Sequence, residues 1–225
     1  MIVVSGSATL PLRVATYAYA EPASRDLRVV VSAEAVATTR VGLGFVLVDA
    51  GGVIAATAVH EASGGAYAFS AVVPPGNYTL RVAAIDPLGR QGSVGRPFAA
   101  RLAAAGGVTV SDLMLARVPA RPQDPLAPLI DHVSANAVIA YLELRAEDGV
   151  ALPNAVRIVV TSASDDRALV AVPATVTRSD AAWAVARATV PLASLPPGAH
   201  VAHAEVLAAG VIVARARRPF TVARR

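Results

Sequence analysis

The chain has 225 residues, of which 55% are hydrophobic and 16% charged, and its formal net charge is +4. This length accommodates two domains of about 100 residues each. The apolar content excludes an intrinsically disordered chain, because it suffices to offset the entropy lost on folding. Cysteine is absent, which excludes disulfides, thiolate catalysis and cysteine-ligated zinc.

The beginning of the chain is unlike a targeting segment. Met1 to Leu12 has no basic region and only scattered apolar residues, so we expect no signal peptide in this chain. A membrane-spanning helix needs about 18 continuous apolar residues. The closest run, Val206 to Ala214, is short and broken at Gly210, so we expect no membrane segment.

The first half of the chain alternates apolar and polar residues with the period of two that is typical of β-strands. Turn signals separate the runs, among them Asp49-Ala50-Gly51-Gly52, Ser63-Gly64-Gly65 and Asp86-Pro87-Leu88-Gly89. The pattern predicts seven strands, which are typical of a β-sandwich. They are Leu10–Tyr19, Leu27–Ala35, Leu43–Val48, Val53–His60, Tyr67–Val72, Asn77–Ile85 and Val94–Leu102.

Residues 119–128 are rich in proline, at positions 119, 122, 125 and 128. A spacing of three matches the three residues per turn of the polyproline II helix. We expect a stiff, extended spacer between two domains, and the alternative is a proline-rich ligand for an aromatic groove. The predicted organisation is a first domain at 1–118, a polyproline-II-like linker at 119–131 and a second domain at 132–225.

The second half contains a further set of predicted strands and repeats two tripeptides of the first. Pro74-Pro75-Gly76 recurs as Pro196-Pro197-Gly198, and Arg96-Pro97-Phe98 recurs as Arg218-Pro219-Phe220, both displaced by the same number of residues. This conserved separation favours two related domains. Pro-Pro-Gly fits a turn from which a strand leaves. Arg-Pro-Phe fits the start of the last strand, where proline is tolerated at an edge and the phenylalanine enters the core, so we interpret both tripeptides as architecture.

The basic residues do not suggest a nucleic-acid partner. All 20 are arginine, and they are densest at Arg215, Arg217 and Arg218, followed by Arg224 and Arg225. Nucleic-acid binding calls for a concentrated basic face with stacking aromatic residues. Alternating arginines on a strand are more typical of a solvated face, and we expect no nucleic-acid partner.

Candidate catalytic and metal-binding residues are few. His200 and His203 lie three residues apart in a predicted strand, so they point to opposite faces and cannot share a metal ion. His60, next to Glu61, is expected in a solvated loop, and His132 is the fourth histidine. Asp165-Asp166 has too few neighbouring oxygen ligands for calcium. We therefore predict no catalytic residues, no metal site, no cofactor and no small-molecule substrate; the chain is not expected to be an enzyme.

The aromatic side chains could either fill the core or form a carbohydrate-binding platform. Trp183 is expected to anchor the second core, with a sugar-binding platform as the alternative. The tyrosines are Tyr17, Tyr19, Tyr67, Tyr78 and Tyr141, and most fall within predicted strands, whereas a carbohydrate-binding module would expose aromatic rings at one end of a sandwich. Asn77-Tyr78-Thr79 matches a glycosylation acceptor only formally.

Several stretches resemble the C-terminal β-sandwich region of bacterial von Willebrand factor A-related (VWFA-related) proteins. They are Leu10-Pro-Leu-Arg-Val-Ala-Thr-Tyr17, Leu43-Gly-Phe-Val-Leu-Val-Asp49, Val73-Pro-Pro-Gly-Asn-Tyr-Thr-Leu-Arg-Val82, Ser111-Asp-Leu-Met-Leu115, and Leu195-Pro-Pro-Gly to Arg218-Pro-Phe220. The Asp-x-Ser-x-Ser metal site of the A domain does not occur here, so no metal-binding residue is transferred. The resemblance implies a non-catalytic accessory region that is extracytoplasmic and binds a protein, such as an A-type domain.

The sequence thus predicts an all-β fold of two tandem immunoglobulin- or fibronectin III-like β-sandwiches joined by a proline-rich linker. The function we expect is that of a non-catalytic structural or protein-interaction module. Two alternatives stay open: a carbohydrate-binding or adhesive module of the cell envelope, and a hydrolase in which a histidine meets a carboxylate in a cleft.

Overall fold

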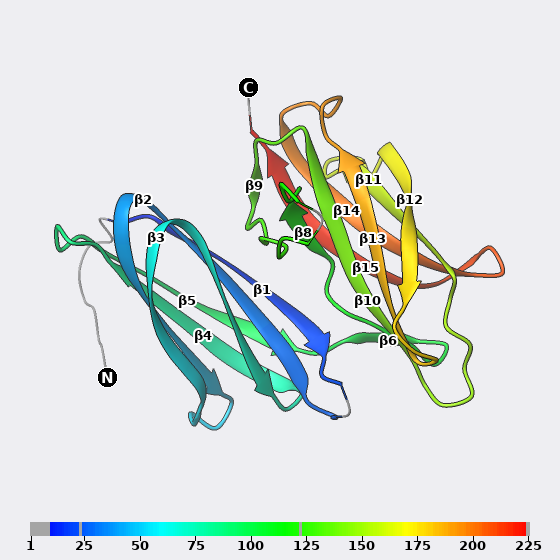
Figure 1. Cartoon of the computed structure of the whole chain (residues 1–225), viewed down its shortest axis with the longest axis horizontal. Helices are drawn as coiled ribbons and strands as arrows, with labels where there is room; N and C mark the ends of the chain where they lie inside the picture. The colour runs from blue at the N-terminus through cyan, green and yellow to red at the C-terminus, as the bar shows by residue number, and fades with distance from the viewer. Residues whose placement is uncertain (1–9, 23, 122, 224–225) are drawn as a thin grey trace. The chain divides into compact units, whose positions relative to one another are not determined.

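The computed structural model describes residues 10–22, 24–121 and 123–223. Every regular element in these residues is a β-strand, so the all-β prediction is confirmed (Figure 1). The chain divides into two compact units. Unit 1 comprises Met1–Thr16 and Glu21–Arg101, and unit 2 comprises Tyr17–Ala20 and Leu102–Arg225.

Unit 1 is built from one five-stranded sheet that folds over on itself. In sheet order β1, β2, β4 and β5 are neighbours, and β3 pairs with β2. The strands are β1 (Leu12–Ala20, whose last four residues belong to unit 2), β2 (Leu27–Asp49), β3 (Ile54–Val73), β4 (Gly76–Ile85) and β5 (Gln91–Ala100).

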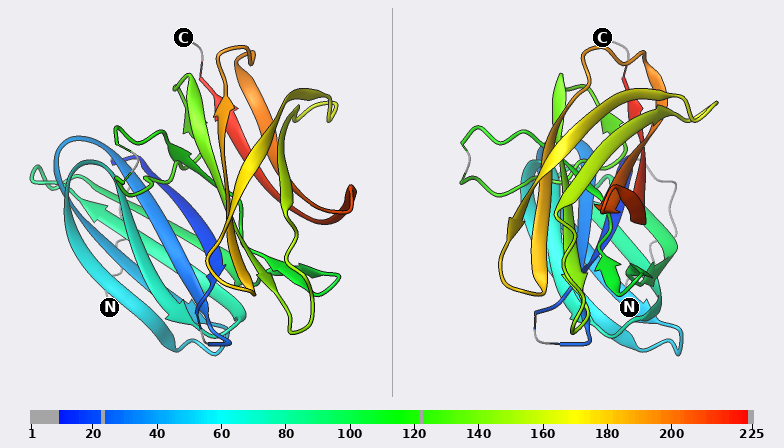
Figure 2. Two further views of the ribbon diagram at one scale, coloured as in Figure 1. Left: turned by 45° about the vertical axis from the view of Figure 1, so that its right-hand side comes forward. Right: turned by 90° about the vertical axis from the view of Figure 1, so that its right-hand side faces the viewer.

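Two long strands create the two layers of unit 1. The first part of β2, Leu27–Ala35, pairs with the second part of β3, and the second part, 40–48, pairs with the first part of β3. Residues 42–49 also pair with β4, so both edges of the second part of β2 are occupied. The pairing of β2 with β1 therefore falls on the first part of β2. Three strand segments therefore face four, as in a seven-stranded immunoglobulin-like sandwich. Figure 2 shows β2 and β3 curving together from one layer to the other.

The strand count differs from the prediction for a physical reason. The expected turn at Ser63-Gly64-Gly65 is wrong, because these residues continue β3, and the expected break after Ala35 lies within β2. The register shifts between Ala35 and Arg40. Such an irregularity bends a strand without ending its hydrogen bonding, and this is how a strand passes from one sheet to another.

The core of unit 1 lies between its two layers and consists of alternate residues from each. Val29 and Val31 from the first part of β2 are almost fully buried, as are Phe45 from its second part and Leu80 and Val82 from β4. Period-two alternation in the sequence is therefore reproduced as alternation between core and exterior.

Unit 2 is a second two-layered structure in which β12 passes from one layer to the other. One layer orders β6, β7, β10, β13 and the end of β12, with β8 also on β10; the other orders the start of β12, β11, β14, β15 and β9. The strands are β6 (Ala103–Ala105), β7 (Val108–Val110), β8 (Met114–Arg117), β9 (His132–Val133), β10 (Ala137–Ala146), β11 (Ala155–Ser162), β12 (Ala168–Arg178), β13 (Trp183–Pro191), β14 (Gly198–Ala208) and β15 (Val211–Val222).

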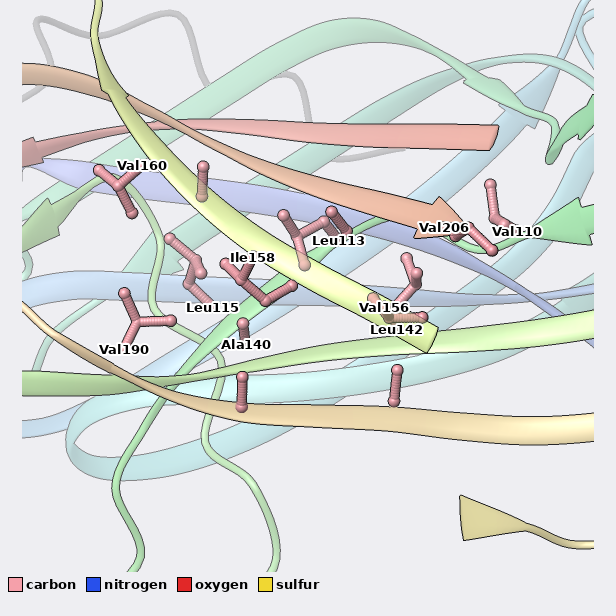
Figure 3. Packing of buried hydrophobic residues seen from close by; sticks show 14 of the residues in the cluster. Val110, Leu113, Leu115, Ala140, Leu142, Val156, Ile158, Val160, Val190 and Val206 are labelled. Atoms are coloured by element: carbon pink, nitrogen blue, oxygen red, sulfur yellow. The ribbon is translucent and has the colours of Figure 1, made fainter. Parts of the chain in front are cut away.

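The core of unit 2 is aliphatic, as the abundance of alanine and valine in the sequence suggests. Leu142 of β10, Ile158 of β11 and Val206 of β14 are almost fully buried in one hydrophobic cluster (Figure 3). Phe220 belongs to this cluster too, but small and β-branched side chains make up most of it and allow the layers to pack closely.

The predicted domain boundaries need correction. Residues 102–118 were assigned to the first domain but belong to unit 2, where β7 and β8 pair with β10. The predicted linker 119–131 also runs within unit 2: Leu129 N donates to Leu115 O at 2.7 Å, and Arg117 N donates to Ala127 O at 3.0 Å. Its apolar end, with Ile130 buried, is held against β8. Burial of these apolar residues outweighs the tendency of spaced prolines to stay extended; Pro122 lies outside the described residues.

Candidate functional site

The repeated tripeptides build the same hairpin in both units. Pro-Pro-Gly precedes β4 and β14, and Arg-Pro-Phe lies in the partner strands β5 and β15. Tyr78 on β4 donates from its hydroxyl to Pro74 O at 2.7 Å, which is the tyrosine corner of immunoglobulin-like folds. Its ring stacks on Phe98, with 5.9 Å between ring centroids. Both tripeptides occupy structural positions in unit 1, but Arg96-Pro97-Phe98 lies within β5 and not at its start, and Phe98 is half-buried and not in the core.

Unit 2 places a histidine where unit 1 places the tyrosine. His200 Nε2 lies 2.9 Å from Pro196 O, and the imidazole packs 5.7 Å from the ring of Phe220. Since a carbonyl oxygen only accepts, Nε2 is the donor in this contact. His200 is buried, and its Nδ1 has no hydrogen-bond partner among the described residues. The histidine therefore takes a structural role in the corner.

The other histidines are not brought together. His203 lies on the opposite face of β14 and contacts Thr161 Oγ1 at 3.2 Å, as the three-residue spacing predicts. His60 stacks on Tyr67, with 3.9 Å between centroids, and lies in β3 and not in the expected loop. His132 is exposed on β9. Within residues 10–22, 24–121 and 123–223, no three His, Cys, Asp or Glu side chains are placed to hold a metal ion.

A buried polar cluster lies on β10, but it encloses no usable space. Tyr141 donates from its hydroxyl to Glu143 Oε1 at 2.8 Å, and Glu143 N donates to Ser111 Oγ at 2.9 Å. Burial, and then the neighbouring Tyr17 and Glu143, raise the pKa of the Tyr19 hydroxyl. The gap beside the cluster has no volume accessible to a water molecule. These groups join strands and do not form a substrate site.

A cavity of about 420 Å³ lies in unit 2 between the turn 162–169 and the corner 196–200. Its hydroxyls are already engaged, since Ser162 Oγ and Ser164 Oγ lie 2.7 Å apart. In the same turn Arg167 N donates to Asp165 Oδ1, and this bond, with a second from Ser162, lowers the pKa of the Asp165 carboxyl. The polar groups of this turn stabilise it locally.

The predicted arginine cluster separates into two roles. Arg215 and Arg217 are exposed, and Arg215 and Arg157 both pair with Glu205, at 3.4 Å and 2.9 Å. Arg218 points the other way: it donates to Ile130 O at 3.0 Å, and its guanidinium lies 4.7 Å from the centroid of the Tyr17 ring. Arg224 and Arg225 lie outside the described residues.

The aromatic residues mostly serve the interior. Tyr17, Tyr19 and Tyr78 are buried, and Tyr67 and Tyr141 are half-buried. Trp183 lies half-buried at the start of β13 opposite Arg145, at the margin of the core, so its predicted role as the core anchor is not confirmed.

No helix in the described residues could cross a membrane.

The feature that stands out is the outer edge of β3 in unit 1. Among the described residues β3 pairs with β2 alone, so the other edge of its first part offers unpaired backbone groups. Apolar side chains are exposed along it: Val59 is 83% exposed, Ile54 61% and, just before the strand, Val53 63%. Folded proteins normally protect such an edge with charge, proline, a β-bulge or a covering segment; here the register against β2 shifts at Ala55, but charge and proline are absent. We call residues 53–59 the β3 edge.

Unit 2 shows the usual protection at its corresponding edge. β12 is likewise the strand that passes between layers, and it carries Pro173 at its centre, opposite Arg157. Proline removes a backbone donor and blocks the addition of a further strand. The β3 edge contains no proline and no charged residue. This edge was not predicted, because a run of apolar residues does not reveal whether a strand is covered. The available signal was that Val53 to Val59 lacks the polar alternation of a half-exposed strand.

Comparisons with known proteins do not assign the chain to a family. No protein-family model and no curated protein matches it. Solved structures that match are red sea bream transglutaminase (11% identity, 95% of this chain, 32% of that chain, TM-score 0.33), a biofilm-associated protein BSP domain (18%, 86%, 27%, 0.34) and Escherichia coli alpha-2-macroglobulin activated by porcine elastase (14%, 98%, 22%, 0.29). The chain thus spans about a third or less of each. The resemblance to VWFA-related proteins gains no support from them.

Proposed function

We propose that this chain is a non-catalytic protein-interaction module that binds a partner by adding a β-strand to the β3 edge. The observation that carries the proposal is a strand edge that is uncharged, free of proline and lined with exposed valine and isoleucine. In strand addition, main-chain hydrogen bonds supply affinity and alternate side chains supply specificity. An edge of this composition is suited to that mode of binding.

The scaffold supports binding because it holds the edge in place before a partner arrives. The first part of β3 is paired with β2 from Ile54 onward, and β2 is in turn paired with β4. The turn that precedes the edge is fixed by Asp49, whose Oδ1 accepts from Gly51 N and Val53 N at 2.9 and 2.8 Å. A pre-formed edge loses little conformational entropy on binding.

The setting of the module is part of the proposal. The resemblance to VWFA-related proteins supports an accessory region beside an A-type domain, in an extracytoplasmic bacterial protein. The carbohydrate-binding alternative receives less support, since three of the five tyrosines are buried and Trp183 is half-buried. Sequencing the gene on both sides of this reading frame tests the accessory role, and an A-type domain encoded in the same protein is the expected result.

A peptide library tests strand addition without knowledge of the partner. Random peptides are selected on the wild-type chain and then on a Val59→Lys variant, which places a charge on the edge. Val211→Lys is the matched control, because Val211 is 66% exposed on a strand of unit 2. We expect peptides of alternating apolar pattern that bind the wild type and the control but not Val59→Lys. The proposal would be refuted if all recovered peptides bound Val59→Lys as well as they bind the wild type.

A further inference from the structure

We infer that unit 2 carries a second binding surface, which takes an acidic segment of a protein partner. It lies on the outer side of β11, β14 and β15, away from the hydrophobic core, and we call it the arginine face. Its residues are Arg157, His203, Glu205, Arg215 and Arg217. The β3 edge belongs to unit 1, so this inference is independent of the proposed function.

The strand register brings these side chains together in two rows. Glu205 of β14 lies opposite Arg157 of β11 on one side and opposite Arg215 of β15 on the other. In the next row, two residues along, His203 lies opposite Arg217. The residues that alternate with His203 and Glu205 on β14 are buried in the core, so both rows face outward.

Two of the three arginines are held in place by the one acidic residue of the surface. Arg157 donates from Nε and Nη2 to Glu205 Oε2, and Arg215 Nη2 donates to Glu205 Oε1 at 3.4 Å. The side chains of Arg157 and Arg215 are nevertheless 50% and 62% exposed. Because a guanidinium group has five N–H donors, both arginines keep donors for a ligand. Their order before binding lowers the entropy cost of association.

Positive charge on this surface exceeds negative charge. Three arginines and one glutamate give a net charge of +2 with His203 neutral. Arg217 is exposed and makes no ion pair within the part of the chain that the structure describes. A guanidinium group that lacks an internal partner is suited to a carboxylate, which it binds through two parallel hydrogen bonds.

The spacing of the arginines matches an extended acidic peptide. Arg215 and Arg217 are two residues apart on one side of β15, which separates them by about 6.6 Å along the strand. Glutamates two residues apart in an extended peptide share one side and have the same repeat. A Glu-x-Glu segment that lies along β15 therefore meets both arginines at once.

The surroundings favour a peptide over a nucleic acid. The structure describes β11, β14 and β15 in full, and their one Phe, Tyr or Trp residue is Phe220, which is buried in the core. Nucleic-acid binding relies on stacking aromatic residues and on a larger excess of positive charge. The outward neighbours of the arginines are instead apolar, such as Val159 and Pro219. A short run of carboxylates is therefore the better match.

A short labelled peptide in which glutamate and threonine alternate is the probe, and fluorescence anisotropy with the full chain measures its binding. We expect binding at chain concentrations up to about 1 mM. It should weaken as salt rises from about 50 to 300 mM, because the charges are exposed. A peptide of the same composition with all glutamates in one block places them on both sides when extended, and it should bind several-fold more weakly.

Two arginine variants connect the binding with this surface. Arg217→Gln leaves Glu205 between its two arginines, and we expect about three- to fivefold weaker binding, the effect of one exposed ion pair. Arg215→Gln has the same expectation. Arg187→Gln is the matched control, because Arg187 is exposed on β13 in the other layer of unit 2 and the net charge changes equally. Circular dichroism checks that each variant is folded.

Three outcomes overturn the inference. The first is no binding of the alternating peptide at about 1 mM chain. The second is binding that survives both arginine variants, or that Arg187→Gln weakens to the same extent, since either result means a non-specific effect of charge. The third is a single-stranded oligonucleotide that binds more tightly than the peptide and depends on Arg217. Peptides selected through the β3 edge would still support the proposed function in each case.

Discussion

The tyrosine corner of unit 1 allows a prediction whose size follows from the structure. Tyr78→Phe keeps the ring on Phe98 but removes the hydroxyl that donates to Pro74 O at 2.7 Å. A neutral hydrogen bond contributes about 0.5–1.5 kcal/mol to the free energy of unfolding. Pro74 is exposed, so water can solvate its carbonyl group in the variant, and we expect a loss of about 1 kcal/mol and not more.

Hydrogen exchange followed by mass spectrometry measures this loss where it occurs. One kcal/mol corresponds to about fivefold faster exchange in the β4–β5 hairpin, and to a Tm lower by about 4–8 °C for a domain of this size. His200→Phe is the equivalent change in unit 2, since it removes the contact with Pro196 O, and should act on β14 and β15. Unchanged exchange in the β4–β5 hairpin of Tyr78→Phe would refute the assignment of the corner as a stabilising bond.

The same residue gives the prediction a pH dependence. Burial raises the pKa of the Tyr78 hydroxyl, and the carboxylates of Asp49 and Asp26 add to the shift. A folded-state pKa above the unfolded value of about 10 means that the contribution is complete below pH 10 and is lost as the pH rises through the folded pKa. The difference in stability between wild type and Tyr78→Phe should therefore shrink above pH 10. A difference that grows there would contradict the reasoning.

Two further predictions concern the β4–β5 hairpin. Asp86 accepts three hydrogen bonds, including one from Arg90 Nε at 2.6 Å, and although burial opposes ionisation these contacts lower the pKa of its carboxyl. Its contribution to stability should therefore be present above about pH 4 and lost as the pH falls. Asp86→Ala should abolish that acid dependence and speed amide exchange in the turn. Gly92→Ala should cost about 1–3 kcal/mol in urea unfolding, because its Cβ would lie 2.0 Å from Leu10 O, whereas Gly95→Ala, with open space around it, should change stability by less than about 0.5 kcal/mol.

The parts of the fold that the sequence predicted are those determined by local chemistry. The turn at Asp86–Gly89 needs a carboxylate cap and a glycine at φ +77°, and the aspartate and glycine in the sequence predict both. The Pro-Pro-Gly repeat was equally legible, because two short motifs kept their separation. Strand positions followed from period-two alternation, which reflects one buried and one exposed face.

The errors arose where distant contacts override local preference. Ser63-Gly64-Gly65 has the composition of a turn, yet pairing with β2 on both sides of it keeps β3 continuous. The prolines of 119–128 suggested an extended spacer, yet Leu129 and Ile130 find partners and burial beside β8. The domain boundary was misplaced for the same reason, since β7 and β8 pair with β10, which begins only at Ala137.

The two units agree where a hairpin must be fixed and differ where an edge must be protected or used. The corner and the stacked ring recur as Tyr78 with Phe98 and His200 with Phe220. Such a hairpin tolerates a change of the hydrogen-bonding ring because either ring reaches the proline carbonyl. The strand that passes between layers has no such constraint on its outer edge, so Pro173 can close it in unit 2 while the β3 edge stays open. An exposed apolar edge is an aggregation liability unless something covers it, and its presence in only one of two related units favours a binding role over a general property of the fold.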